Sequence, residues 1–354
     1  MAIFFSSPRL LNPGRLANAI AYKMLPKKEV LAYRPLELST YITFRCNVSC
    51  TICAVVNAKL LDQSYEMPED LSIKDFTSIV DEYSQCLVSV AFSGGEPLLN
   101  KDLFKMARLA SLRGLFTELF TNGLLMKEYI PMILEYMNSV NVSFNGSDSE
   151  EYHSMHNVPP KMFEVLVENT ARLVELRDRS RRKMKIKMSY VCTRSNFMRI
   201  QAFIELAESL RVDEVWFNNL TCYGLPGFGG SQCLYADDDE VVELVKAVKS
   251  PKTKIKIFLP KLYERTSTIR ACIFPFSVLT IAGGGCVFPC CSIFPPSEGH
   301  VNMFSSKEIW NSQVFVDLRR RLINKSLPLP QICLRCNNRF SGSKRRIIKG
   351  ASRT

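Results

Sequence analysis

The chain has 354 residues, of which 47% are hydrophobic, enough for one large domain with a buried core and a smaller second domain. This composition excludes an intrinsically disordered protein, and no apolar run is long enough to span a membrane as a helix. The net charge of +12 is compatible with nucleic acid, an anionic membrane surface or an acidic substrate. No basic motif interleaved with aromatic residues is present, so nucleic acid is not an expected partner.

Residues 1–35 are expected to form a basic extension ahead of the first strand. The apolar start Met1–Phe5 is too short for a signal peptide, and Pro8 and Arg9 follow at once, so we expect a cytoplasmic protein. The stretch from Leu10 to Leu25 is partly amphipathic. It either packs on the main domain or touches a membrane surface or a partner.

Between residues 36 and 265, short apolar runs alternate with segments whose apolar residues are spaced by three and four. The expected strands are Leu36–Thr43, Leu87–Ser93, Phe116–Thr121, Ser139–Asn145, Lys185–Cys192, Val212–Asn218 and Lys254–Phe258. Helices are expected over residues 76–83, over residues 104–112 with a C-cap at Gly114, and over residues 162–176. This alternation predicts an α/β fold in which parallel strands are joined by helical crossovers. About six such units favour a partial (β/α)6 TIM-like barrel, with its site beyond the carboxyl ends of the strands.

The pattern changes after residue 265. Three consecutive glycines, Gly283 to Gly285, precede a proline-rich stretch, and cysteines become concentrated. This composition indicates a small cysteine-rich domain over residues 266–342, held by metal rather than by a large core, followed by a basic tail over residues 343–354.

Thirteen cysteines in a chain that is neither small nor evidently secreted favour metal binding over disulfides. Four of them, Cys86, Cys192, Cys222 and Cys233, stand alone and are expected to be small packed side chains. Cys46, Cys50 and Cys53 directly follow the first expected strand and can hold three corners of a [4Fe–4S] cluster, leaving one iron open for a reaction. Incidental cysteines or a zinc knuckle are the alternatives, although the nearest histidine, His153, is far along the chain.

The triplet Cys-x3-Cys-x2-Cys after a first strand resembles the signature of the radical S-adenosylmethionine (SAM) superfamily. The segment Ser93-Gly94-Gly95-Glu96-Pro97 is similar to the family's glycine-glycine-glutamate motif, which binds the amino end of SAM. The resemblance implies SAM contacts from Gly94, Gly95, Glu96 and Pro97. Glycines let backbone groups approach a ligand, and a carboxylate accepts from an ammonium group.

Further likenesses follow at the ends of the next strands. The third expected strand ends with Thr121-Asn122-Gly123, a segment that resembles the one often found at this place in family members. Ser143 and Asn145 end the fourth, where the family places polar groups on the ribose, and Tyr190 to Asn196 corresponds to the region that meets the adenine. Asn145 departs from the acidic residue that related sequences often have, but an amide can also bond a hydroxyl group.

The C-terminal cysteines Cys272, Cys290, Cys333 and Cys336 resemble those of the auxiliary-cluster domain called SPASM. Gly299 to Asn302, Glu308 to Asn311 and the Leu318-Arg319 pair match the usual connection of that domain. No cysteine follows Cys336, so a shortened, twitch-like version with one [4Fe–4S] cluster and these four ligands fits best. Cys291 could replace Cys290, or Cys286 and Cys291 are packed thiols, and a structural zinc site is the rival.

The resemblance implies two [4Fe–4S] clusters, SAM, and an electron donor such as flavodoxin or ferredoxin. SAM cleavage by the open cluster would give a 5′-deoxyadenosyl radical that abstracts a hydrogen atom, and the second cluster could then accept an electron. We expect oxidation or rearrangement of a small polar metabolite. Maturation of a ribosomal peptide or protein is the first alternative. The resemblance disfavours it, because many peptide-modifying members of the family carry a leader-binding domain ahead of the barrel, whereas only about 35 residues precede the first strand here. A non-catalytic zinc or iron–sulfur protein is the second. The candidates for a general base, Tyr190, Arg194, Asn218 and Tyr223, are expected to be structural or to orient the substrate.

Overall fold

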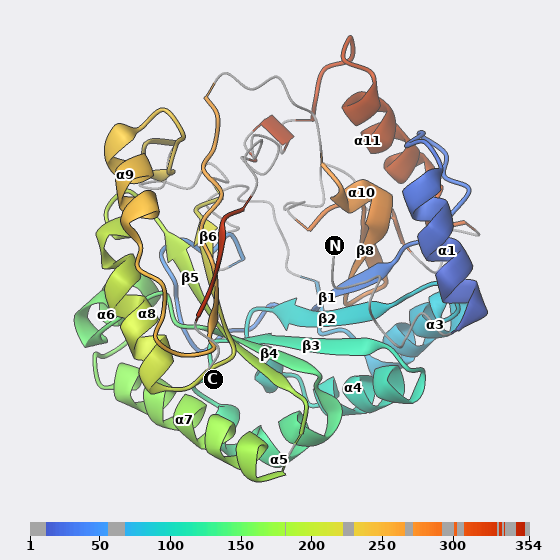
Figure 1. Ribbon diagram of the computed structural model, residues 1–354. Coiled ribbons are helices and arrows are strands. Elements are labelled where there is room, and N and C mark those ends of the chain that lie inside the picture. Colours follow the sequence, from blue (N-terminus) through green and yellow to red (C-terminus); the bar gives the residue numbers. More distant parts are fainter. Residues whose placement is uncertain are drawn as a thin grey trace. The chain divides into compact units, whose positions relative to one another are not determined.

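The structure is a computed structural model with a mixed α/β fold (Figure 1). It describes residues 12–55, 68–180, 182–221, 230–265, 272–291, 301–302, 308–330, 333–334, 336 and 345–350. The chain divides into two compact units. Unit 1 comprises Met1–Cys46, Asp62–Leu119 and Arg270–Leu334, and unit 2 comprises Asn47–Leu61, Phe120–Ile269 and Arg335–Thr354.

Unit 1 contains a sheet in the order β10-β9-β8-β1-β2-β3. Its strands are β1 (Glu37–Thr43), β2 (Ser89–Gly94), β3 (Phe116–Thr121, whose last two residues belong to unit 2), β8 (Val278–Ala282), β9 (Cys286–Phe288) and β10 (Val301–Asn302). Its helices are α1 (Pro13–Met24), α3 (Ile73–Tyr83), α4 (Leu103–Leu112), α10 (Phe274–Ser277) and α11 (Gln313–Ile323). Strand β1 is parallel to both β2 and β8, whereas β9 is antiparallel to β8 and β10.

Two helices of unit 1, α3 and α4, lie where the sequence predicts helices, although α3 begins three residues earlier than expected. Ser72 caps α3 by accepting a hydrogen bond from the backbone of Asp75, and the apolar residues spaced by three and four are the buried ones. Helix α4 is followed by Gly114, whose positive φ of 70° is the conformation that glycine favours after a helix end.

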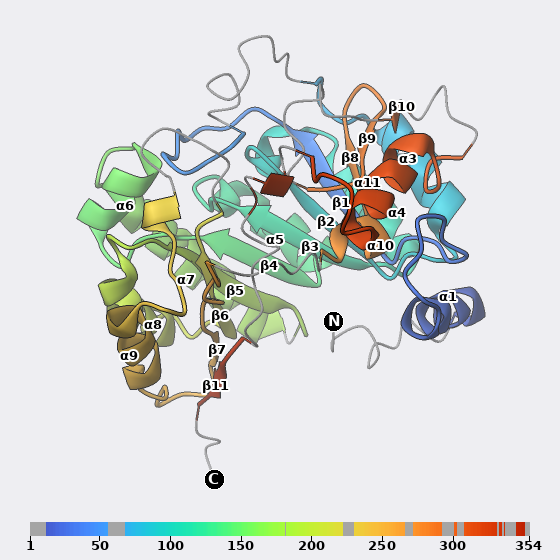
Figure 2. The same cartoon turned by 90° about the horizontal axis from the view of Figure 1, so that it is seen from above.

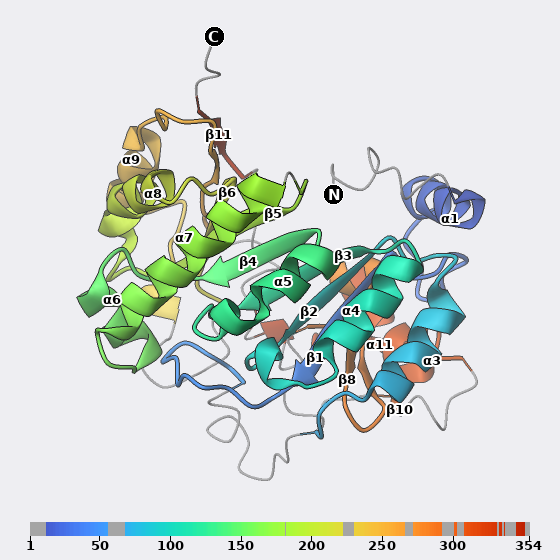
Figure 3. The same cartoon turned by 90° about the horizontal axis from the view of Figure 1, so that it is seen from below.

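Unit 2 contains strands in the order β4-β5-β6-β7-β11, parallel up to β7 and antiparallel between β7 and β11. The strands are β4 (Ser139–Ser143), β5 (Lys185–Cys192), β6 (Glu214–Asn219), β7 (Lys256–Phe258) and β11 (Ile347–Lys349). The helices are α5 (Met126–Tyr136), α6 (Ser149–His156), α7 (Met162–Ser180), α8 (Ile200–Ser209) and α9 (Asp239–Ala247), and Figure 3 shows α5 and α7 side by side. Aromatic rings form part of the core, since Phe203 contacts the rings of Phe144, Tyr190 and Phe217.

The predicted strands match β1 to β7 within two residues at each end, and the predicted parallel pairing is present in both units. Strand β8 was not predicted, because its fully buried run Val278–Ala282 shows no alternation and stands beside the glycines and cysteines. The predicted basic tail contains β11. None of the described helices is both long and apolar enough to cross a membrane. Of the lone cysteines, Cys192 and Cys233 are buried, Cys86 is half-buried, and Cys222 lies outside the described residues.

Candidate active site

In unit 1 the predicted Gly-Gly-Glu motif pairs with the backbone that follows β1. The amide of Gly95 donates to the carbonyl of Thr43 over 2.7 Å, and the amide of Glu96 donates to that of Arg45 over 2.8 Å. Arg45 is the last residue before Cys46, the first cysteine of the triplet. The two motifs that are far apart in the sequence are therefore joined by backbone hydrogen bonds.

This pairing explains why both positions are glycine. A Cβ atom on Gly94 would overlap with the carbonyl oxygen of Thr43, and one on Gly95 would overlap with that of Arg45. Gly94 also has a φ of 133°, which side chains rarely adopt. The close approach of the chain that follows β1 therefore requires glycine at both positions. The ligand contact expected from the sequence is a separate reason for glycine at these positions.

Glu96 is fully buried at the start of a short 3-10 helix, Pro97–Leu99. One of its carboxylate oxygens accepts from the amide of Leu98 over 3.1 Å, and Pro97 occupies the first helical position, where no amide is needed. The carboxylate is therefore held in one orientation at the end of β2. A buried carboxylate of this kind suits a cationic partner such as an ammonium group.

Cys46, Cys50 and Cys53 have half-buried side chains. Cys46 is the last residue of the first segment of unit 1, whereas Cys50 and Cys53 lie on the segment that begins unit 2. No three ligand side chains converge on one metal position among the described residues, so the ligand set is inferred from spacing and from thiol chemistry. Thiolates are the usual ligands of iron–sulfur clusters, and the triplet fits that chemistry.

The segment that carries Cys50 is attached to the last turn of α6. The amide of Ser49 donates to the carbonyl of His156 over 3.2 Å, and the amide of Thr51 donates to that of Met155 over 3.0 Å. Predicted Asn122, which follows β3, donates from its amide to the side-chain oxygen of Asn47 over 2.7 Å. Asn122 therefore positions the cysteine segment from a second side.

His156 is a neighbour of the triplet that the sequence did not indicate. Its ring is buried, with Nδ1 3.0 Å from the sulfur of Cys50 and Nε2 3.0 Å from the carbonyl oxygen of Phe144. Burial lowers the pKa of His156 to about 4, although the Phe144 carbonyl opposes this shift. The sequence around His156 does not indicate this contact. The position of His156 beside Cys50 depends on how α6 packs against the rest of unit 2.

The predicted ribose-contacting residues lie at the end of β4. Asn145 has a φ of 48° and is nearly fully buried, and its side-chain oxygen accepts from the amide of Val191 over 2.9 Å. Asparagine tolerates this left-handed conformation better than most residues. The hydrogen bond ties the end of β4 to β5. Ser143, the last residue of β4, is half-buried.

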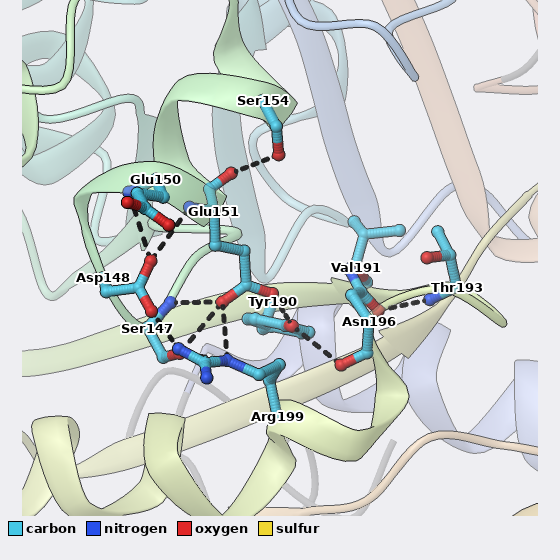
Figure 4. A network of polar contacts seen from close by, with 10 residues as sticks. All are labelled: Ser147, Asp148, Glu150, Glu151, Ser154, Tyr190, Val191, Thr193, Asn196 and Arg199. Atoms are coloured by element: carbon cyan, nitrogen blue, oxygen red, sulfur yellow. Dashed lines mark hydrogen bonds and ion pairs between the residues drawn. The ribbon is translucent and has the colours of Figure 1, made fainter.

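A polar network joins this turn to the end of β5 (Figure 4). Glu151 of α6 accepts from the amide of Ser147 over 2.7 Å and from its hydroxyl over 2.9 Å, and the buried hydroxyl of Tyr190 donates to the same carboxylate. Arg199 forms an ion pair with Asp148 and lies 3.8 Å from Glu151. Glu151 thus links α6 to β5, a role that no local sequence pattern indicates.

The segment after β5 is held in shape by hydrogen bonds of its own side chains. Asn196 accepts from the amide of Thr193 over 2.7 Å and donates to the carbonyl of Val191 over 3.0 Å. The hydroxyl of Tyr190 lies 3.1 Å from the carbonyl oxygen of Asn196. These bonds fix the shape of residues 190–196, the predicted adenine-contacting region.

The candidates for a general base are engaged in structural contacts. Burial, followed by its hydrogen bond to Glu151, raises the pKa of Tyr190. Arg194 pairs with Asp238 and Glu240, and the side-chain oxygen of Asn218 accepts from Arg345 over 3.1 Å. These observations favour structural roles, and Tyr223 lies outside the described residues.

The C-terminal cysteines Cys272, Cys286, Cys290, Cys291, Cys333 and Cys336 are all half-buried. Within unit 1 the hydroxyl of Tyr41 on β1 donates to the carbonyl of Cys291, which attaches this region to the central strands. Trp310 is fully buried and donates to the carbonyl of Tyr33 over 2.8 Å, and the guanidinium of Arg319 lies over its ring. The connection between the cysteines is therefore anchored by a buried cation–π pair. Gly299 and His300 lie outside the described residues.

Comparisons with known proteins agree with this arrangement. The family model of the radical SAM superfamily matches residues 40–184, and that of SPASM, an iron–sulfur cluster-binding domain, matches residues 272–337. The PqqA peptide cyclase of Gluconobacter oxydans (strain 621H) is 24% identical over 221 residues, which are 62% of this chain. The match spans only 59% of that relative's length.

Solved structures share the fold. SuiB of Streptococcus suis bound to the precursor peptide SuiA has a TM-score of 0.65 at 17% identity, covering 92% of this chain and 75% of SuiB. Native anSMEcpe with bound AdoMet has a TM-score of 0.56 at 16% identity, covering 87% and 88% of the two chains. These likenesses confirm the predicted α/β class, a partial TIM-like barrel with a C-terminal cluster domain.

The two matching family models define the cofactors as well as the fold. A radical SAM domain binds a [4Fe–4S] cluster and SAM, and a SPASM domain binds auxiliary iron–sulfur clusters. Together the two models cover more than half of the sequence, in the order in which the cysteine groups occur. This chain therefore belongs to the radical SAM superfamily and carries a C-terminal SPASM domain.

Proposed function

We propose that this radical SAM enzyme oxidises a ribosomal peptide or protein, with the C-terminal cluster as electron acceptor. The observation that carries the proposal is the succession of three motifs: the cysteine triplet after β1, the Gly-Gly-Glu segment after β2, and the C-terminal cysteines. A cluster with an open iron and a second, fully ligated cluster provide for radical formation and electron removal in one protein.

The peptide is preferred to the small polar metabolite because of the similar proteins. The curated relative is named a peptide cyclase, and SuiB was crystallised with a precursor peptide. The net charge of +12 supports an acidic substrate or an acidic segment near the modified residue. The small metabolite remains the competing substrate class that the experiment below separates.

The first cluster would be held by Cys46, Cys50 and Cys53. With the cluster and SAM bound, this site would supply a 5′-deoxyadenosyl radical able to take a hydrogen atom from the substrate. Asn122 and the last turn of α6 keep the cysteine segment in place through their bonds to Asn47, Ser49 and Thr51. The protein would thus contribute to this step by holding the three cysteine thiolates in position.

SAM would be held by groups at the ends of β2, β4 and β5. The buried carboxylate of Glu96 would accept from the SAM ammonium, with Gly94, Gly95 and Pro97 shaping the backbone around it. Ser143 and the amide nitrogen of Asn145 would bond the ribose hydroxyls, since the oxygen of Asn145 already accepts from Val191. Residues 190–196, which are held in shape by their own hydrogen bonds, would border the adenine.

The auxiliary cluster would be held by Cys272, Cys290, Cys333 and Cys336. When bound, it would serve as an acceptor for one electron. Together with the hydrogen atom taken by the SAM-derived radical and the loss of one proton, this would remove two hydrogens from the substrate and consume SAM as oxidant. A flavodoxin or ferredoxin would supply the reducing electron for SAM cleavage.

The test is coexpression of the enzyme with short peptides encoded beside its gene, followed by tandem mass spectrometry of the peptides. The proposal expects loss of two hydrogens per modification, at a defined residue, only with the intact enzyme. If no peptide changes mass and a purified small polar metabolite is dehydrogenated instead, the competing substrate class is correct.

A double variant distinguishes the ligands of the auxiliary cluster from those of the first cluster. Replacing Cys333 and Cys336 with alanine should lower iron by about half, stop peptide oxidation and leave some uncoupled SAM cleavage. The matched control is alanine at Cys86, which stands outside both groups and should leave iron content unchanged. Iron that is unchanged in the paired variant would contradict the ligand assignment.

A further inference from the structure

Helix α1 has one face that is firmly attached to unit 1. The guanidinium of Arg15 donates to the carbonyl of Ser84 over 3.1 and 3.0 Å and to that of Gly114 over 2.9 Å. Asn18 accepts from the amide of Arg34 over 2.7 Å, and Ala19 and Tyr22 are buried beside it. The orientation of the helix about its own axis is thereby fixed.

The opposite face of α1 is apolar and exposed. Leu16, Ile20 and Met24 are 43%, 50% and 74% exposed, and their spacing of four residues places them in one stripe along the helix. Leu25 and Val30, 40% and 55% exposed, follow within six residues of the helix end. Figures 2 and 3 show α1 at the rim of unit 1.

Exposed apolar side chains are unusually concentrated in this stretch of the chain. Of the eleven large apolar side chains that are exposed among the described residues, five fall within residues 16–30. Single exposed apolar residues need no explanation, but a concentration that includes a stripe along one helix face indicates an interaction surface. We call these five residues, Leu16, Ile20, Met24, Leu25 and Val30, the α1 surface.

The charge around the α1 surface is positive. Residues 12–28 contain Arg15, Lys23, Lys27 and Lys28 but no aspartate or glutamate. Lys23 and Lys28 are exposed, and Lys27 lies over the ring of Tyr22 at 3.5 Å. The first acidic residue, Glu29, is paired with Arg320 over 2.7 Å. An apolar stripe bordered by lysines and without carboxylates is complementary to anionic headgroups above an acyl layer.

We infer that the α1 surface docks on an anionic lipid surface, with the apolar stripe in the acyl boundary and the lysines at headgroup level. The twelve residues of α1 are about 18 Å long, enough to lie along a bilayer surface but not to cross it. The buried polar contacts of Arg15 and Asn18 hold the stripe outward without any rearrangement of unit 1. The inference is independent of the proposed reaction.

Cosedimentation of the full-length protein with vesicles tests this inference. Vesicles of phosphatidylglycerol and phosphatidylcholine should bind the protein, and binding should weaken with added salt and be much lower on phosphatidylcholine alone. The triple variant Leu16→Gln/Ile20→Gln/Met24→Gln should bind at least about tenfold more weakly. Because all three side chains are exposed, its thermal unfolding midpoint should stay close to that of the wild type.

The matched control is the double variant Met198→Gln/Ile347→Gln, which replaces side chains that are 59% and 48% exposed in unit 2. It should bind vesicles as the wild type does. Absence of binding to anionic vesicles, or equal binding by the triple variant, would overturn the inference. It would also be overturned if the wild type ignores vesicles but self-associates in sedimentation experiments and the triple variant does not, since the surface would then serve a protein contact.

Discussion

The two units hold their motif residues by different means. In unit 1 the Gly-Gly-Glu segment is fixed by backbone hydrogen bonds to Thr43 and Arg45, and glycine is needed because the two chains approach so closely. In unit 2 the ends of β4 and β5 are fixed by side chains, chiefly Asn145, Glu151 and Tyr190. The first arrangement tolerates no added atom, whereas the second should weaken gradually as single hydrogen bonds are removed.

The largest effect is expected from Gly95→Ala. The added Cβ would overlap with the carbonyl oxygen of Arg45 and would lie 2.9 Å from that of Phe44, so the backbone before Cys46 must move. We expect loss of about 3 kcal/mol in the free energy of unfolding and loss of SAM binding to the cluster-loaded protein. Thermal unfolding and equilibrium binding of SAM measure the two effects.

Gly230→Ala is the control for this substitution. Its added Cβ would meet only the hydroxyl end of Tyr235 at 3.1 Å, and a flexible side chain can yield. We expect little change in stability or SAM binding. If Gly95→Ala behaves in the same way, the backbone pairing does not determine the position of the motif.

An intermediate effect is expected from Glu151→Gln in unit 2. The change weakens the bonds to Ser147 and Tyr190 and the ion pair with Arg199 but adds no bulk. We expect a loss of about 1–2 kcal/mol in stability. SAM affinity should fall by about threefold to tenfold while the maximal rate of 5′-deoxyadenosine formation changes less.

Glu205→Gln is the matched control, since Glu205 is exposed on α8 and outside the network. It should leave stability and SAM affinity unchanged. An equal effect of both substitutions would show that the loss of one negative charge, rather than the network, is responsible.

A smaller effect is expected on the pH dependence of stability through Tyr190. Because burial and then the bond to Glu151 raise the pKa of Tyr190, the folded state keeps its proton at pH values where the unfolded chain releases it. The contribution is complete below the ordinary tyrosine pKa of about 10 and is lost as the pH rises above it. Denaturant unfolding between about pH 9 and pH 11 should show a steeper loss of stability for the wild type than for Tyr190→Phe. Equal slopes would contradict this role.

The smallest effect is expected from Asn145→Asp. Aspartate keeps the oxygen that accepts from Val191 and tolerates the left-handed backbone, so stability should change little. Its second oxygen can accept from a ribose hydroxyl where the amide nitrogen would donate to one, so SAM affinity should also change little. Asn145→Val removes the acceptor and puts a β-branched residue at a φ of 48°, so it should cost about 1–3 kcal/mol. Thermal unfolding compares the two variants, and equal midpoints would show that the turn does not depend on this side chain.

Much of the fold follows from local sequence patterns, because β2 and β5 are short runs rich in buried residues with clear ends, and α3 and α4 have apolar spacing and terminal signals. The cysteine triplet and Glu96 stand where strands end, so their positions could also be predicted. His156 and Glu151 could not, because their contacts with Cys50 and Tyr190 depend on how α6 packs. Strand β8 was not predicted, because its fully buried run shows no alternation and its pairing with the distant β1 leaves no local signal.

The central claim is that Cys46, Cys50 and Cys53 hold the cluster that cleaves SAM. Its most direct test is the formation of 5′-deoxyadenosine by protein that has been reconstituted with iron and sulfide without oxygen and then reduced. The wild type and the variant with alanine at Cys333 and Cys336 should form this product, and the variant with alanine at all three N-terminal cysteines should form none. Product from the triple-alanine variant, or a wild-type preparation that contains only zinc, would contradict the claim.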